Sequence, residues 1–127
     1  MRSYVQSLLY ALAGLSHAFQ TEKNLKLFTV LYVLSLAIAA GVQVRSRDWE
    51  VLIFGGGIFL SFELVNTALE HLTDAFDDHS KSTHAKAIKA TKDIAAGASL
   101  VCAVAWGVIT LMVFWPYAKT LLGLVGM

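Results

Sequence analysis

The chain has 127 residues, of which 57% are hydrophobic, well above the roughly 45–50% usual for a soluble domain. Charged residues make up 15%, and the formal net charge is +1, so the composition gives no reason to expect a nucleic-acid partner. A single cysteine, Cys102, excludes a disulfide within the chain. The length allows one domain, and we expect residues 1–127 to form a single integral-membrane domain.

The N-terminal segment, about residues 3–20, is predicted to form an amphipathic helix. Leu8, Leu12, Leu15 and Phe19 recur at helical spacing and form one apolar stripe, while more polar side chains follow another face. A helix of this kind can lie in the membrane interface with its apolar side toward the lipid. Packing of the same helix against the rest of the fold is a compatible alternative.

Three apolar blocks follow, each about long enough to cross a bilayer. They are predicted to span the membrane over about residues 25–44, 49–69 and 94–117. A short polar turn separates the first two, and a longer charged connection separates the last two. The fold class is therefore an all-α membrane protein with a surface helix and three transmembrane helices. A bundle of three helices is too thin to enclose a site, so we expect a homo-oligomer.

Basic residues predict the orientation of the spans. Seven lie before the first span or between the second and third: Arg2, Lys23, Lys26, Lys81, Lys86, Lys89 and Lys92. Three lie on the other side: Arg45, Arg47 and Lys119. The positive-inside rule therefore places the N-terminus and the 71–93 connection in the cytoplasm. Three aromatic residues then fall at the outer interface, as an aromatic belt would: Trp49, Trp115 and Tyr117.

The second span carries an acidic stripe on its cytoplasmic half. On a helix, its polar side chains fall within about a 100° arc: Glu63, Asn66, Thr67, Glu70 and Asp74. Burying a carboxylate at membrane depth costs roughly 2.5–3.5 kcal/mol. The stripe can offset this cost by binding a divalent cation through its oxygen atoms. Alternatively, one carboxyl group is protonated, or has a raised pKa and acts as a general base. The structural alternative is that Glu63 and Asn66 only form hydrogen bonds between helices.

Further charged residues are predicted at the same membrane depth as the acidic stripe. Lys92 and Asp93 stand at the mouth of the third span, and Glu22 stands at the entry to the first. Lys92 can reach a phosphate group as a point charge. The sequence lacks a G-x-x-x-x-G-K-[ST] loop, so a nucleotide would be held by metal and by isolated basic or amide groups. The four histidines match no zinc-binding spacing.

These residues resemble a known family. Two segments resemble the prokaryotic diacylglycerol kinase and undecaprenol kinase family: Glu63-Leu-Val-Asn66-Thr67-Ala-Leu-Glu70 with Asp74, and Lys92-Asp93-Ile-Ala-Ala-Gly97-Ala. The run from Tyr10 to Asn24, which includes Glu22, resembles the N-terminal segment of the same family. The resemblance extends to about residue 116. It implies a bacterial inner-membrane lipid kinase that uses ATP and Mg²⁺, built as a homotrimer with active sites shared between subunits.

The resemblance also implies roles for individual residues. Glu63 would be the general base that takes the proton of the lipid hydroxyl. Glu22 and Glu70 would hold Mg²⁺ together with the nucleotide phosphates. The nucleotide-binding positions would be Tyr10, Asn66, Lys92 and Asp93, and Thr67 and Asp74 complete the supporting polar stripe.

Some features depart from the family pattern. The connection between Asp74 and Lys92 is a few residues longer than expected, and Phe28 stands where Gram-positive members usually have a histidine. The amino-acid sequence of the motifs favours undecaprenol as the lipid alcohol, with diacylglycerol a close second. Two other functions remain open: an ion or proton pathway along the acidic stripe, which gives no role to Lys92 or Glu22, and a catalytically inactive membrane scaffold of the same fold.

Overall fold

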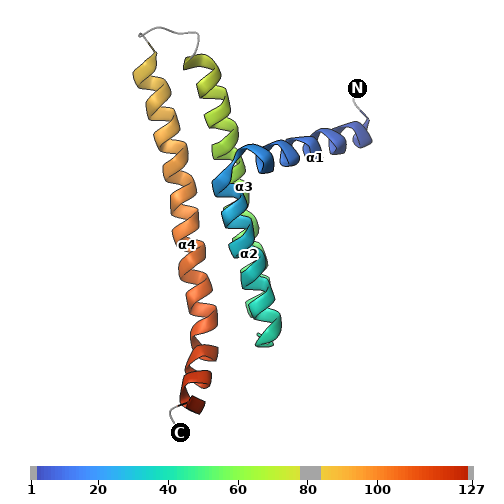
Figure 1. Ribbon diagram of the computed structural model, residues 1–127, viewed down its shortest axis with the longest axis vertical. Helices are drawn as coiled ribbons and strands as arrows, with labels where there is room; N and C mark the ends of the chain where they lie inside the picture. The colour runs from blue at the N-terminus through green and yellow to red at the C-terminus, as the bar shows by residue number, and fades with distance from the viewer. Residues whose placement is uncertain (1–2, 78–83, 126–127) are drawn as a thin grey trace.

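The computed structural model describes residues 3–77 and 84–125 (Figure 1). Four helices make up this part of the chain: α1 (Tyr4–Thr21), α2 (Lys23–Gly41), α3 (Ser46–Asp77) and α4 (Ala85–Val125). The last three are each long and apolar enough to cross a membrane. The predicted fold, an all-α membrane protein with an N-terminal helix and three spanning helices, is confirmed.

The first helix leaves the bundle sideways, while the three long helices run side by side (Figure 1). Ser3 and Gln6 form a reciprocal capping box at its start, with hydrogen bonds of 3.1 and 3.2 Å, which satisfies backbone N–H groups that the first turn leaves free. The helix ends at Glu22, whose extended backbone turns the chain into α2. Glu22 therefore occupies the corner between the surface helix and the first span.

Helix α3 is the centre of the bundle, since it packs against both α2 and α4. Aromatic rings fill the space between the three helices. The Phe28 and Phe59 ring centroids are 4.8 Å apart, and Phe59 stacks on Trp106 at 5.5 Å. Phe59 is 1% exposed, so this cluster fixes how the three helices meet.

A glycine in the middle of α3 allows close approach to α2. The Tyr32 ring lies directly over Gly56, and a Cβ atom at that position would overlap it. The Tyr32 hydroxyl donates a hydrogen bond to the backbone oxygen of Ile53 at 3.0 Å. Small residues commonly permit such contacts between membrane helices, and here the small residue accommodates a specific aromatic ring.

A polar cluster closes the bundle at its other end. The Tyr117 hydroxyl donates to Asp48 Oδ2 at 2.9 Å and accepts from the backbone N–H of Arg45 at 3.1 Å. The Arg45 side chain also contacts Asp48, at 3.3 Å. These bonds tie the turn between α2 and α3 to α4.

Both long helices continue beyond the predicted spans. Helix α3 runs to Asp77, and α4 begins at Ala85 and passes through Pro116, so much of the expected charged connection is helical. The segments 71–77 and 85–96 contain neither Gly nor Pro, and their Ala and Lys residues favour helix. Residues 78–83, which carry part of the unusually long connection, lie outside the described residues. At 1.5 Å per residue, α4 is about 60 Å long, twice the roughly 30 Å hydrocarbon core.

Candidate active site

The deepest polar group of the acidic stripe, Glu63, lies between α3 and α4. Its side chain faces the interior, with only 4% of the residue exposed. The Ser99 hydroxyl, from α4, donates a hydrogen bond to Glu63 Oε2. Ser99 is 5% exposed. A buried carboxyl group needs such a partner because desolvation without a hydrogen bond is costly.

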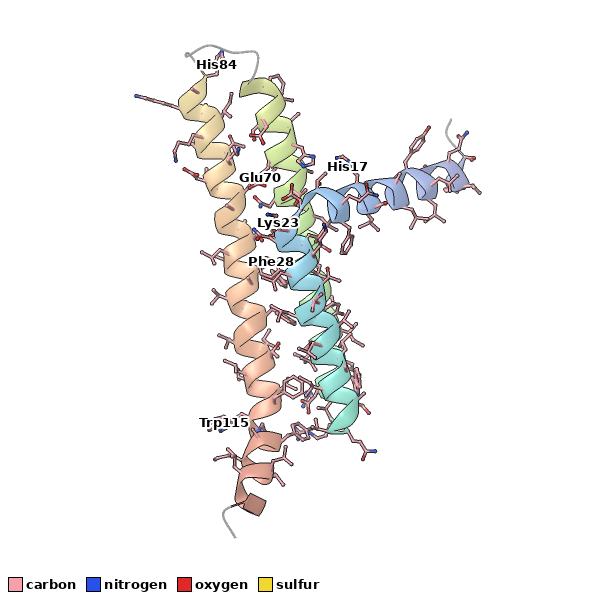
Figure 2. All side chains as sticks on the ribbon, in the orientation of Figure 1. His17, Lys23, Phe28, Glu70, His84 and Trp115 are labelled. Carbon is pink, nitrogen blue, oxygen red and sulfur yellow. The ribbon has the colours of Figure 1, made fainter. Side chains whose placement is uncertain are left out.

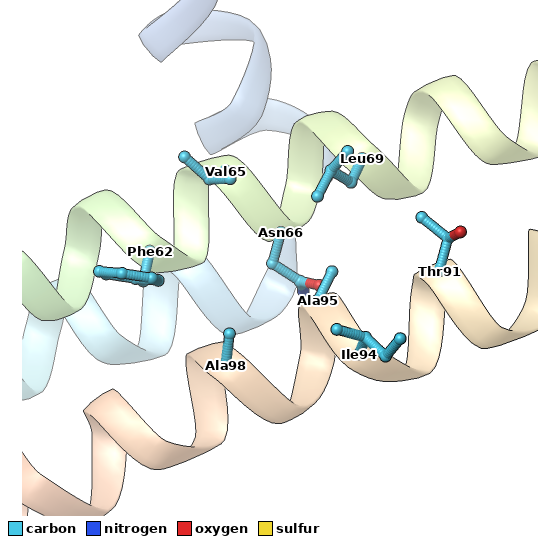
Figure 3. Close-up of a pocket in the computed structure, with 8 residues that line it drawn as sticks. All are labelled: Phe62, Val65, Asn66, Leu69, Thr91, Ile94, Ala95 and Ala98. Atoms are coloured by element: carbon cyan, nitrogen blue, oxygen red, sulfur yellow. The ribbon is translucent and has the colours of Figure 1, made fainter.

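Asn66 lies one turn closer to the predicted cytoplasmic side. It is buried, and its Oδ1 atom has no hydrogen-bond partner within the described residues. Figure 3 shows the amide pointing from α3 toward Ala95 on α4, at the floor of a groove. The groove holds about 290 Å³, and its walls are mostly apolar: Phe62, Val65, Leu69, Thr91, Ile94, Ala95 and Ala98. Buried acceptors are normally paired, so the Asn66 amide oxygen is suited to accept a hydrogen bond from a group outside this chain.

Beyond Asn66, one ion pair links α4 to α3 and a second lies within α4. Lys92 Nζ lies 2.6 Å from Asp74 Oδ1, joining α4 to α3. Lys89 Nζ lies 2.7 Å from Asp93 Oδ2 within α4. The structure thus places Lys92, the predicted phosphate contact, against Asp74, a carboxylate of the acidic stripe. The pair is partly exposed, so Lys92 can exchange this partner for a phosphate at modest cost.

The corner residue Glu22 reaches α3. Its Oε1 atom lies 3.1 Å from His71 Nε2, and the His71 ring makes an edge contact with His17 of α1, with ring centroids 5.4 Å apart. Figure 2 shows His17, Lys23 and Glu70 at similar heights along the bundle, near the junction of α1 with it. Helix α1 is therefore held to α3 at the level of the two predicted metal-binding carboxylates.

The oxygen donors present fit a Mg²⁺ ion that is shared with a nucleotide. The half-buried Glu70 carboxylate forms no hydrogen bond or ion pair within residues 3–77 and 84–125, and Glu22 has only Oε1 against His71. Within the same ranges, no three His, Cys, Asp or Glu side chains form a metal cluster. Mg²⁺ usually takes one or two carboxylates together with substrate phosphates, so two acidic residues suffice.

The predicted site residues occupy four different places in the structure. Glu63, Asn66 and Thr67 are buried on α3, whereas Asp74 and Asp93 are exposed beyond them. Glu22 lies at the corner beside His71. Tyr10 is 60% exposed on α1, which extends away from the bundle that carries the other predicted residues (Figure 1).

The sequence interpretation missed two contacts of this site, those of Ser99 and His71. Ser99 lies within the apolar third span, and His71 had been considered only for zinc-type spacing. A serine about two helical turns from the charged end of a span is unremarkable in sequence. Only the packing of α4 on α3 shows that its hydroxyl meets Glu63.

Comparison with known proteins identifies the family. Residues 9–114 match the model of the prokaryotic diacylglycerol kinase family. The chain belongs to this family. It is 31% identical over 116 residues to the undecaprenol kinase of Bacillus subtilis, covering 91% of each chain. It is 36% identical over 99 residues to a diacylglycerol kinase of Synechocystis sp., covering 78% of this chain and 55% of that protein. The resemblance inferred from the motifs is confirmed, as is the prediction that the chain is a lipid kinase.

Proposed function

We propose that this kinase transfers the γ-phosphate of ATP to the hydroxyl group of a membrane lipid, with Glu63 as the general base and Mg²⁺ as the cofactor. The observation that carries the proposal is the buried Glu63 carboxyl group, held at membrane depth in a chain of the lipid kinase family. A lipid hydroxyl arrives from the bilayer and ATP from the aqueous phase. The stripe from Glu63 to Asp74 spans eleven residues of helix, or about 16 Å, across that boundary.

The proposed reaction is a direct transfer of the γ-phosphate from ATP to the lipid, assisted by the residues of the acidic stripe. The lipid oxygen attacks the γ-phosphorus as its proton passes to the Glu63 carboxylate. The bond between the γ-phosphorus and the β–γ bridging oxygen breaks, and ADP leaves. Phosphoryl transfer needs mainly positioning and charge neutralisation, which Asn66 and Lys92 supply at the nucleotide side. Tyr10 and Asp93 complete the proposed nucleotide contacts, and Thr67 and Asp74 support the stripe.

Glu22 and Glu70 are the proposed holders of Mg²⁺. When bound with ATP, the ion neutralises phosphate charge and orients the transferring group. Glu22 lies beside His71, which directly follows Glu70 in α3, so the two carboxylates lie at a similar level along the bundle. The active site is proposed to be completed by a neighbouring subunit in a homotrimer, since the α1 helix that carries Tyr10 extends away from the bundle (Figure 1).

Undecaprenol is the favoured lipid alcohol, and diacylglycerol is second. The undecaprenol kinase relative aligns over 91% of both chains, whereas the diacylglycerol kinase relative is matched over 55% of its length. The distribution of Lys and Arg supports an inner-membrane protein with the N-terminus and the 71–93 connection in the cytoplasm. ATP and the proposed site then lie on the same side.

Substitution of the proposed base tests the mechanism. Glu63→Gln removes the proton acceptor but keeps the volume, so we expect lipid phosphorylation to fall by at least about a hundredfold, the usual range for loss of a general base. Binding of Mg·ATP, measured by equilibrium dialysis with the purified protein in detergent, should stay close to that of the unmodified protein. Near-normal turnover by Glu63→Gln would refute the assignment of the base.

A further inference from the structure

Ser99 differs from most of the other Ser and Thr residues described in the long helices. In an apolar helix, a Ser or Thr side chain commonly bonds to the backbone carbonyl oxygen of its own helix three or four residues earlier. Ser61, Thr91 and Thr110 each do so, at 2.8, 2.9 and 2.8 Å. Ser99 instead donates across the bundle to the Glu63 carboxyl group. The partner of the Ser99 hydroxyl therefore lies on another helix and not on its own.

The bond occupies one specific oxygen of the carboxyl group. Ser99 donates to Oε2 of Glu63, and within residues 3–77 and 84–125 no hydrogen bond is formed to Oε1. Both residues are at most 5% exposed, so water does not compete freely for the bond. A carboxyl group fixed through Oε2 keeps its side-chain rotamer, and Oε1 stays available for the hydroxyl group of a substrate.

We propose that Ser99 is a positioning residue for phosphoryl transfer, which holds Glu63 through Oε2 so that Oε1 faces the lipid hydroxyl. The inference rests on the proposed role of Glu63 as the base and adds to it the residue that orients the base. Small misplacements of a reacting group are costly, since an error of about 1 Å can lower a rate a hundredfold. The hydroxyl of Ser99 therefore acts on kcat and not on nucleotide binding.

Steady-state kinetics of matched variants test this role. In Ser99→Ala, we expect kcat for lipid phosphorylation to fall by about tenfold or more, with the KM for Mg·ATP unchanged. Ser99→Thr keeps the hydroxyl and should restore most of the lost kcat. Ser61→Ala is the control, because the Ser61 hydroxyl bonds to the Gly57 carbonyl oxygen of its own helix, and it should match the unmodified protein.

Infrared spectroscopy reports directly on the hydrogen bond to the Glu63 carboxyl group, which a purely structural role of Ser99 would not affect. The carboxyl band that disappears in Glu63→Gln belongs to Glu63, and it should shift in Ser99→Ala but not in Ser61→Ala. If Ser99→Ala proves too unstable to purify, Ser99→Cys replaces it, since the thiol fills the same space but is a weak donor. The same loss of kcat is expected.

The outcomes separate this inference from the proposed function. Unchanged kcat in Ser99→Ala, alongside an inactive Glu63→Gln, would overturn the role of Ser99 and leave the base assigned. A loss of kcat that Ser99→Thr does not restore, or an equal loss in affinity for Mg·ATP, would show that Ser99 acts through packing, and would also overturn the proposal. Full turnover in Glu63→Gln would remove the proposed function itself.

Discussion

Tyr117 is expected to stabilise the end of the bundle remote from the proposed site. Tyr117→Phe removes one hydrogen bond to the Asp48 carboxylate and the acceptor of the Arg45 backbone N–H. Asp48 is only 9% exposed, so water replaces the lost donor poorly, whereas the exposed Arg45 can turn to water. A hydrogen bond to a charged group contributes about 1.5–3 kcal/mol, so we expect the free energy of unfolding to fall by about 2 kcal/mol.

Unfolding in mixed micelles of increasing denaturing detergent, followed by circular dichroism, measures this change. Tyr4→Phe is the matched control because Tyr4 is 96% exposed on α1, and it should leave the transition in place. Kinase activity of folded Tyr117→Phe should be unchanged, since Tyr117 is two residues from Trp115, which Figure 2 shows far along the bundle from Glu70. A transition of Tyr117→Phe that coincides with that of Tyr4→Phe would refute the reasoning.

Three further predictions concern packing and nucleotide binding. Gly56→Ala should destabilise the bundle by about 1–3 kcal/mol because the new Cβ overlaps the Tyr32 ring. Gly57→Ala is the control, because a Cβ there meets open space, and it should not destabilise the bundle. Unfolding of the two variants at the same detergent concentration would contradict the predicted overlap with Tyr32. Lys92→Met should raise the KM for Mg·ATP about tenfold or more, as expected for loss of a charged phosphate contact, and an unchanged KM would exclude that contact. Glu70→Gln should weaken Mn·ATP binding, followed by Mn²⁺ paramagnetic resonance, and unaltered binding would remove Glu70 as a metal-binding residue.

The helices were predictable because lipid imposes a strong constraint on sequence. Apolar segments of membrane-spanning length and the amphipathic pattern at 3–20 specify the fold class by themselves. The ends of the helices were less well predicted. A charged segment such as 85–93 reads as a connection by hydropathy, yet its Ala and Lys residues favour helix. Pro116 stands within α4 instead of ending it, as membrane helices often tolerate.

The burial of polar side chains on one face of α3 was predictable from the sequence, whereas their partners on other helices were not. Glu63 and Asn66 stand out because buried polar groups in a span are costly, and helical periodicity places them on one face. The partners of these groups depend on the rotation of α4 and on the corner at Glu22. Ser99 and His71 are ordinary residues in sequence, and their contacts with Glu63 and Glu22 follow only from three-dimensional packing.

Phosphate transfer from γ-labelled ATP is the most direct test of the central claim. The purified protein in detergent micelles with Mg²⁺ is offered undecaprenol and diacylglycerol side by side, with Glu63→Gln as the inactive control. The account predicts labelled lipid, with undecaprenol the better acceptor, and none from Glu63→Gln. Label in neither lipid from folded protein that binds Mg·ATP would contradict the account.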